Sequence, residues 1–263
     1  MTHEPIIDIA ADAEDMAMRA ALWLATRIVV ASEPFALNLA GGSTPKRVYE
    51  LLASAAFKPY IDWNKVHLFW GDERFVPIDH KDSNYRMVHE AMIAHVPIPP
   101  DHIHRVPVEA GTPEKAAALY EEDLQRFYGT RYGGAKSLDP ARPLFDVTLL
   151  GLGTDGHTAS LFPGTKALDE RESWTIAVIG VKDEARVSLT YPAIEASAAI
   201  LFLVAGEEKR AALAGVLAKD LALPAARLKT DAPVLWFVDR AAVSETDAAA
   251  QANASEAKAS SEI

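Results

Sequence analysis

One pattern constrains the fold of this chain more than any other. A short apolar run stops at a turn of glycines or charged residues, and a helical spacing of apolar residues follows. The pattern recurs at residues 35–45 (FALNLAGGSTP), 66–74 (VHLFWGDER), 145–157 (FDVTLLGLGTDGH) and 199–209 (AILFLVAGEEK). Such alternation favours a mostly parallel sheet covered on both faces. We therefore predict an α/β fold of the Rossmann-like, doubly wound kind, whose crossovers bring several turns to one edge of the sheet.

Further elements follow from local spacing. Apolar runs predict strands at 174–180, 186–191 and 234–238. Apolar residues at helical spacing predict helices at 12–30, from 82 or 83 to 92, at 112–129 with Leu119 on the buried face, and after Gly206 as far as Leu217. Five strand-turn units that alternate with helical patterns support the mostly parallel sheet.

Length and composition bound the domain organisation. The chain has 263 residues, of which 49% are hydrophobic, so it can form one α/β domain with a sizeable core. No break in composition marks a second domain, and we expect residues 1–243 to form a single α/β domain. Residues 244–263 are mostly Ala, Ser and acids without an apolar face, which predicts a disordered tail.

Charge and cysteine content exclude several classes of function. The net charge of −11 argues against a nucleic-acid partner, because such binding needs a basic surface. The chain has no cysteine, which excludes disulfides, thiol nucleophiles and thiolate metal sites. The first residues are acidic where a signal peptide would be basic, and no apolar run is long enough to cross a bilayer. We expect a cytoplasmic protein without a membrane partner, which can bind a small anion where cations gather.

The stretch from residue 145 to 165 contains the first candidate for chemistry. A buried run at 147–150 leads into a turn with Gly151, Gly153 and Gly156, and His157 follows directly. We predict a strand, a glycine-rich turn, an exposed histidine and a short helix. In an open α/β sheet such a turn lies where ligands bind, and glycines permit close backbone approach. The alternative is that His157 only caps or packs against its neighbours.

A second turn has the composition of an anion site. Gly41 and Gly42 precede Ser43, Thr44 and Pro45 at the start of a helical pattern. Either hydroxyl residue can cap that helix, and its N–H groups and dipole favour an anion such as phosphate. The turn matches neither the Walker A nor the GxGxxG pattern, so nucleotide binding is not indicated. A capped turn without a ligand is the alternative.

Charged residues follow two other strands. Asp72, Glu73 and Arg74 stand in a row after the apolar run 66–70, where they are better placed facing a cleft than a core. Arginine can bind phosphate or carboxylate through two parallel hydrogen bonds. A solvated loop with an internal salt bridge is the alternative. We expect the remaining histidines to be structural or on the surface: His67, His80, His89, His95, His102 and His104.

Two further cations are candidates for the cleft. Arg186 begins a predicted strand and could reach the cleft, or could remain an edge arginine. Lys209 lies in the first turn of a predicted helix, where the helix dipole disfavours a cation. An anion bound at that position would explain the lysine.

Taken as a set, these turns resemble those of the 6-phosphogluconolactonase family, within the superfamily that includes glucosamine-6-phosphate deaminase. The motifs occur in the family's order and span about residues 8 to 240. They are 37–52 (LNLAGGSTPKRVYELL), 66–77 (VHLFWGDERFVP), 82–87 (DSNYRM), 145–165 (FDVTLLGLGTDGHTASLFPGT), 185–194 (ARVSLTYPAI) and 206–210 (GEEKR). Thr154 stands where the family usually has glycine, a minor departure.

The resemblance implies an activity and a site. It implies hydrolysis of 6-phospho-D-glucono-1,5-lactone to 6-phosphogluconate, the second step of the oxidative pentose phosphate pathway, without a metal or organic cofactor. His157 would be the general base, and the other catalytic residues would be Asp72 and Arg74, with Asp72 either orienting His157 or binding substrate hydroxyls. The residues expected to bind the anionic sugar phosphate are Gly42, Ser43, Thr44, Asp155, Gly156, Arg186 and Lys209. We expect a monomer or a small homo-oligomer.

Four other functions fit the sequence less well. The deaminase pattern has Asp-Glu-Tyr at residues 72–74, where this chain has Arg74. A noncatalytic sugar-phosphate sensor would carry a DNA-binding or partner module, and no basic helix-turn-helix segment is present. A serine hydrolase would need a GxSxG elbow, which is absent around Ser160. A metal site on Asp155 and His157 lacks further ligands at useful spacing.

Overall fold

A computed structural model describes residues 5–32 and 34–243. Seven strands form one sheet, and every neighbouring pair in it is parallel. The prediction of an α/β, mostly parallel sheet is therefore confirmed. In spatial order the strands are β1 (Ile6–Ala10), β10 (Val234–Asp239), β9 (Ile200–Val204), β6 (Val147–Gly151), β2 (Phe35–Leu39), β3 (Val66–Trp70) and β5 (Ile103–His104).

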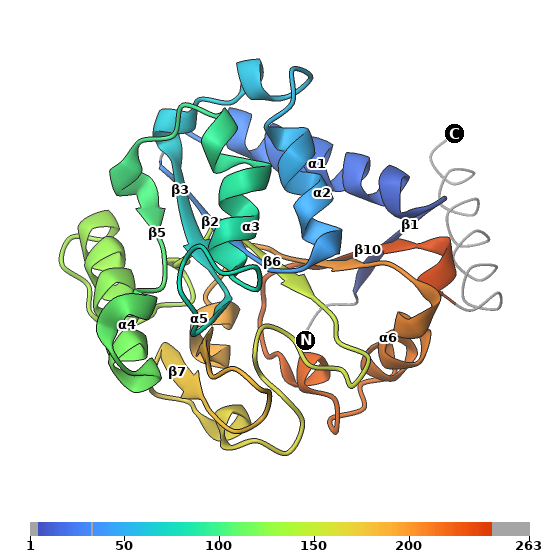
Figure 1. Cartoon of the computed structure of the whole chain (residues 1–263). Coiled ribbons are helices and arrows are strands. Elements are labelled where there is room, and N and C mark those ends of the chain that lie inside the picture. Colours follow the sequence, from blue (N-terminus) through green and yellow to red (C-terminus); the bar gives the residue numbers. More distant parts are fainter. Residues whose placement is uncertain (1–4, 33, 244–263) are drawn as a thin grey trace.

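Helices cover both faces of this sheet, as a doubly wound fold requires (Figure 1). Three lie on one face: α1 (Ala13–Val30), α2 (Ser43–Leu52) and α3 (Asn84–Ala91). The opposite face is covered by α4 (Pro113–Arg131), α5 (Tyr191–Glu195) and α6 (Arg210–Leu217). Short 3₁₀ turns occur at 58–60, 63–65, 93–95, 100–102, 108–110, 166–169, 207–209, 224–227 and 240–242.

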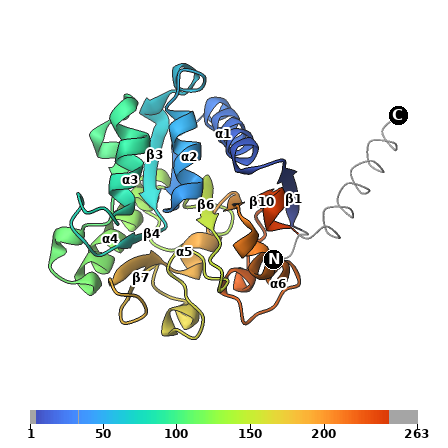
Figure 2. The same ribbon diagram turned by 45° about the vertical axis from the view of Figure 1, so that its right-hand side comes forward.

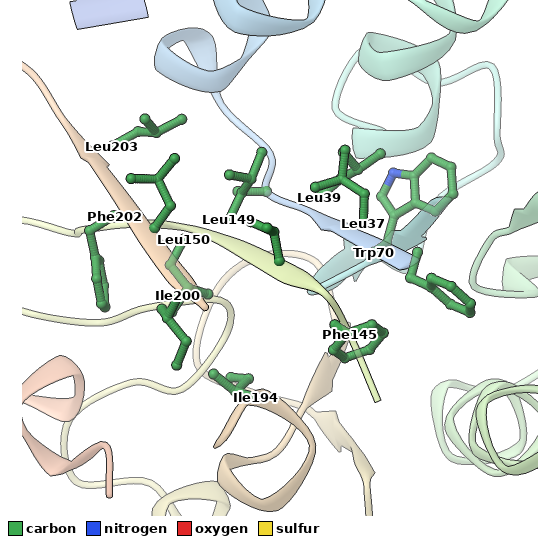
Figure 3. Close-up of a cluster of buried hydrophobic side chains, with 14 of the residues drawn as sticks. Leu37, Leu39, Trp70, Phe145, Leu149, Leu150, Ile194, Ile200, Phe202 and Leu203 are labelled. Carbon is green, nitrogen blue, oxygen red and sulfur yellow. The ribbon is translucent and has the colours of Figure 1, made fainter. Parts of the chain in front are cut away.

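The core lies on both sides of the central strands, which explains why their sequences are apolar without alternation. Figure 3 shows Leu37, Leu39 and Trp70 on one face of the sheet, and Phe202 and Ile194 on the other. The buried side chains form one continuous cluster. The strands at the centre of the sheet are therefore fixed by packing from both sides, and their carboxyl ends form a rigid edge.

A second, smaller sheet was not predicted. It consists of β4 (Asp72–Arg74), β8 (Arg186–Leu189) and β7 (Thr175–Val178), and both of its pairs are antiparallel. Figure 2 shows β4 and β7 beneath the carboxyl end of β3. The predicted strands at 174–180 and 186–191 are present, but they pair with each other outside the parallel sheet. A connection as short as 179–185 allows only an antiparallel pair, because a parallel pair needs a crossover of a dozen or more residues.

Other local predictions also need correction. The strand β1 was not predicted, and Leu119 is 38% exposed rather than buried. No helix follows His157 directly: Thr158 and Leu161 form an isolated bridge, and Ala159 has a φ of 47°, which a right-handed helix excludes. The predicted tail 244–263 lies outside the described residues. Within 5–32 and 34–243, no helix combines the length and apolar character needed to cross a membrane.

Candidate active site

The site lies at the point where the order of the sheet reverses. The chain leaves β2 toward β3 on one side, and leaves β6 toward β9 on the other, although β2 and β6 are neighbours. Ligands of open α/β sheets bind in the crevice that opens at such a point. Here a cavity of about 670 Å³ opens at the carboxyl ends of these strands. Eight of the predicted site residues line it: Gly42, Ser43, Thr44, Asp72, Arg74, His157, Arg186 and Lys209.

His157 is oriented by a carboxylate two residues earlier in the same turn. Its Nδ1 lies 2.5 Å from Oδ1 of Asp155, and its backbone N–H donates to the same oxygen at 3.1 Å. Burial raises the pKa of Asp155, but the hydrogen bonds from His157 outweigh it and hold that pKa below its usual value. Asp155 is therefore ionised at neutral pH and accepts a hydrogen bond from Nδ1–H of His157. That tautomer leaves Nε2 as the nitrogen that can take a proton.

Glycines make room for this pair. A Cβ on Gly153 would stand 2.0 Å from Nδ1 of His157, so no side chain fits there. Gly156 has a φ of +76°, and a Cβ would stand 2.8 Å from the side chain of Leu223. Asp155 and Gly156 are not among the residues that line the cavity. Asp155 instead contacts the imidazole of His157.

The start of α2 forms one wall of the cavity. Gly42 is its N-cap with a φ of 104°, a conformation that favours glycine, and no side chain caps the helix. The prediction that Ser43 or Thr44 caps it is wrong, because the helix already begins at Ser43. Both hydroxyls instead line the cavity, next to the N–H groups of the first turn, which have no carbonyl partner within the helix.

The three charged residues of β4 have different surroundings. Asp72 is 7% exposed, accepts a hydrogen bond of 2.6 Å from Ser160, and lies 3.6 Å from Nη1 of Arg186. Glu73 does not face the cleft: its carboxylate accepts hydrogen bonds from the backbone N–H of Arg74 and from those of Asn84 and Tyr85, the first two residues of α3. Burial raises the pKa of Glu73. The structure places Asp155, rather than Asp72, beside His157.

Cations from three segments border the cavity: Arg74 of β4, Arg186 of β8 and Lys209 of the turn 207–209. The side chain of Arg186 is 15% exposed, and its Nε is buried without a hydrogen-bond partner in the described part of the chain. Nε of Arg74 is in the same condition, while its Nη1 donates to the carbonyl of Asp82. Lys209 ends the 3₁₀ turn before α6 and lines the same cavity. Buried guanidinium groups with unused donors favour an anion.

Sequence reasoning missed some residues of the cavity. Arg47 and Glu14 line it as an ion pair of 2.6 Å between α2 and α1. Asn84 donates from Nδ2 to the carbonyl of Asp72 at 2.8 Å and occupies the space that a Cβ on Gly41 would need. Asn84 lies within the motif 82–87, but more than 40 residues separate it from Gly41, so the sequence does not show that the two are in contact. Nothing in the sequence pairs Arg47 with Glu14.

Two buried tyrosines hold the strand ends that border the cavity. The hydroxyl of Tyr49 donates to the carbonyl of Ala40 and accepts from its N–H, at 2.8 and 3.0 Å. Tyr120 makes the same two bonds to Trp70, at 3.0 and 2.8 Å. Burial raises the pKa of both phenols, so the hydroxyls remain protonated donors. In the described ranges, no group of three His, Asp or Glu side chains could hold a metal ion.

The sequence of this chain is similar to those of known proteins. Residues 11–236 match the family described as glucosamine-6-phosphate isomerases/6-phosphogluconolactonase. A 6-phosphogluconolactonase of Nostoc sp. is 43% identical over 215 residues, which cover 80% of this chain and 84% of that protein. A 6-phosphogluconolactonase of Synechocystis sp. is 38% identical over 245 residues, which cover 90% and 97%.

A solved structure agrees with these sequence matches. The crystal structure of 6-phosphogluconolactonase from Thermotoga maritima is similar with a TM-score of 0.72 and 30% identity, and the match covers 90% of this chain and all of that one. The family match spans most of the chain, and the relatives match along nearly their whole lengths. This chain therefore belongs to the glucosamine-6-phosphate isomerase/6-phosphogluconolactonase family.

Proposed function

We propose that this protein hydrolyses 6-phospho-D-glucono-1,5-lactone to 6-phosphogluconate, the second step of the oxidative pentose phosphate pathway. One observation carries the proposal: an imidazole oriented by a carboxylate and a group of cations border the same cavity. The substrate has a lactone carbonyl at one end and a phosphate at the other, so it needs both. The names of the relatives agree with this activity.

His157 acts as the general base. Its Nε2 takes a proton from a water molecule while the water oxygen forms a bond to C1 of the lactone. General base catalysis supplies about 100- to 10,000-fold, and the ordinary pKa of histidine, just below neutrality, suits it to the role. The ionised Asp155 stabilises the imidazolium that forms. When the bond from C1 to the ring oxygen breaks, the imidazolium returns its proton to that oxygen. We assign Asp155 to positioning, because it acts on the reaction only through His157.

The negative charge that develops on the carbonyl oxygen needs hydrogen-bond donors. Arg74 and the amides of the turn after β6 are the candidates for this role, because they border the cavity near His157. Asp72 does not contact the imidazole; it holds Arg186 and Ser160 in place. We assign it to positioning as well.

The phosphate binds where cations and the first turn of α2 border the same cavity. Arg186 and Lys209 supply positive charge, and the N-terminus of α2, with Gly42, Ser43 and Thr44, supplies hydrogen-bond donors. Concentrated cations explain how a chain with a net charge of −11 can bind an anion. The phosphate thus fixes one end of the substrate, and C1 falls within reach of His157.

The proposal also covers the cellular location, the number of subunits and the domain boundary. We propose a cytoplasmic enzyme that is a monomer or a small homo-oligomer and whose single domain ends near residue 243. Light scattering of the purified protein would give the number of subunits, and cell fractionation would give the location.

The activity is tested by supplying the purified protein with the lactone and following proton release in a weakly buffered solution. We expect hydrolysis well above the rate without protein. His157→Ala should lose at least about 100-fold in kcat while still binding phosphate. Ammonia release from glucosamine-6-phosphate, or hydrolysis that is unchanged in the variant, would overturn the proposal.

A further inference from the structure

Phe162 lies in the same loop as His157 and is almost completely buried, with 2% of its surface exposed. Its ring centroid is 4.5 Å from that of His157, and the two rings are tilted by 38°. This contact, together with Asp155 at Nδ1, places the imidazole between a carboxylate and an aromatic ring. A residue outside the predicted site therefore contacts the proposed base directly.

Two cations contact the same ring. Cζ of Arg186, at the start of β8, lies 5.6 Å from the ring centroid. Nζ of Lys182, in the exposed connection between β7 and β8, lies 5.2 Å from it. Both distances are within the range of about 6 Å in which a cation is attracted to an aromatic face. One ring thus joins the turn that carries the base to the segment that carries two cations.

The other contacts of Arg186 leave it incompletely held. Its distance of 3.6 Å to Asp72 is too long for a hydrogen bond, and its Nε has no partner in the described ranges. The ring of Phe162 therefore supplies a contact that fixes the guanidinium while its donors stay available for an anion.

We propose that Phe162 is a positioning residue, whose ring fixes the imidazole of His157 relative to the cations of Arg186 and Lys182. This inference rests on the proposed function. The electron-rich face of the ring stabilises the positive charge that forms on His157 when it takes a proton from water. The same ring contacts Arg186, which lines the cavity, and holds its guanidinium at a set distance from the base, and so sets where C1 lies once the phosphate is bound.

An electrostatic role can be separated from simple packing by changing the ring without changing its shape. Replacing Phe162 by 3,4,5-trifluorophenylalanine keeps the aromatic outline but removes most of the negative charge from its face. We expect kcat to fall by about two- to thirtyfold, and the inhibition constant of inorganic phosphate to rise by a factor in the same range. The midpoint of thermal unfolding should stay close to that of the wild type.

Two natural substitutions complete the test. Phe162→Leu removes the ring and should lower kcat and weaken phosphate inhibition at least as much as the fluorinated ring does. Phe145→Leu is the matched control, because Phe145 is equally buried but lies in the core at the start of β6 (Figure 3). It should lower the unfolding midpoint without changing the inhibition constant of phosphate.

The outcomes distinguish this inference from the proposed function. If the fluorinated protein has the kcat and phosphate inhibition of the wild type, Phe162 only fills space and the inference is wrong, although the wild-type enzyme remains a lactonase. If Phe162→Leu and Phe145→Leu change only the unfolding midpoint, the same conclusion holds. A wild-type protein without lactonase activity would instead refute the proposed function itself.

Discussion

Replacing Gly153 by alanine would test the proposed base through its surroundings. The new Cβ would stand 2.0 Å from Nδ1 and 2.2 Å from Cε1 of His157, and 2.7 Å from Oδ1 of Asp155. Since non-bonded heavy atoms are in ordinary contact at about 3.5 Å, the imidazole must retreat by more than about 1 Å. A displacement of that size can cost about 100-fold in rate. We therefore expect kcat for the lactone to fall by about 100-fold.

The assay is the initial rate of lactone hydrolysis, with circular dichroism and thermal unfolding to show that the variant is folded. Gly129→Ala is the control, because it adds the same methyl group on α4, outside the cavity, where the nearest atom lies 3.3 Å away. Its kcat should be close to that of the wild type. If Gly153→Ala were folded and fully active, His157 could not be the base in the orientation described here.

Three further results are expected. Asp155→Asn should lower kcat by at least about tenfold with little change in KM, because the imidazolium loses its charged partner. Lys209→Met should raise KM and the inhibition constant of inorganic phosphate by about tenfold or more, while Lys115→Met, on the exposed face of α4, should change neither. Burial and neighbouring histidines lower the pKa of His67 to about 4. The folded state disfavours the protonated ring, so the free energy of unfolding, followed in urea, should decrease as the pH falls from about 6.5 toward 4.

The size of the pH effect is limited by solvent. His67 is half-buried, so screening reduces its contribution to no more than about 2 kcal/mol. His67→Gln should flatten the dependence of the unfolding free energy on pH between pH 4 and 6.5, and an unchanged slope would show that other groups cause it.

For Asp155→Asn, a full wild-type kcat would show that the carboxylate does not act on His157. For Lys209→Met, an unchanged phosphate inhibition would place the phosphate elsewhere.

The sequence predicted the parts of the fold that depend on local pattern. Strands β2, β3, β6, β9 and β10 are apolar runs because both of their faces are buried, and such runs are visible without knowing their neighbours. Glycines at the strand ends predicted the turns that border the cavity. The same reasoning brought His157, Arg186 and Lys209 into one site.

The parts that failed depend on contacts between distant segments. The residues Asp72–Arg74 are charged, so they were expected at a cleft and not as a strand, and they form one because β8 pairs with them. Glu73 turned away from the cleft because the first two residues of α3, Asn84 and Tyr85, present their N–H groups to its carboxylate. The link between Asp155 and His157 was within reach of the sequence, since a spacing of two residues in a tight turn brings such side chains together.

The hydroxyls of Tyr49 and Tyr120 have a consequence for how the enzyme meets its substrate. The hydroxyl of each tyrosine hydrogen-bonds to the N–H and the carbonyl of one residue at the carboxyl end of a strand, Ala40 or Trp70. These bonds hold the backbone at the point where the strand ends. Little conformational entropy remains to be lost at these walls when the lactone binds. Amide exchange at Ala40 and Trp70 should accordingly be as slow as in mid-strand. Only the turns can then change conformation to fit the sugar ring, and the strand ends keep the same positions between catalytic cycles.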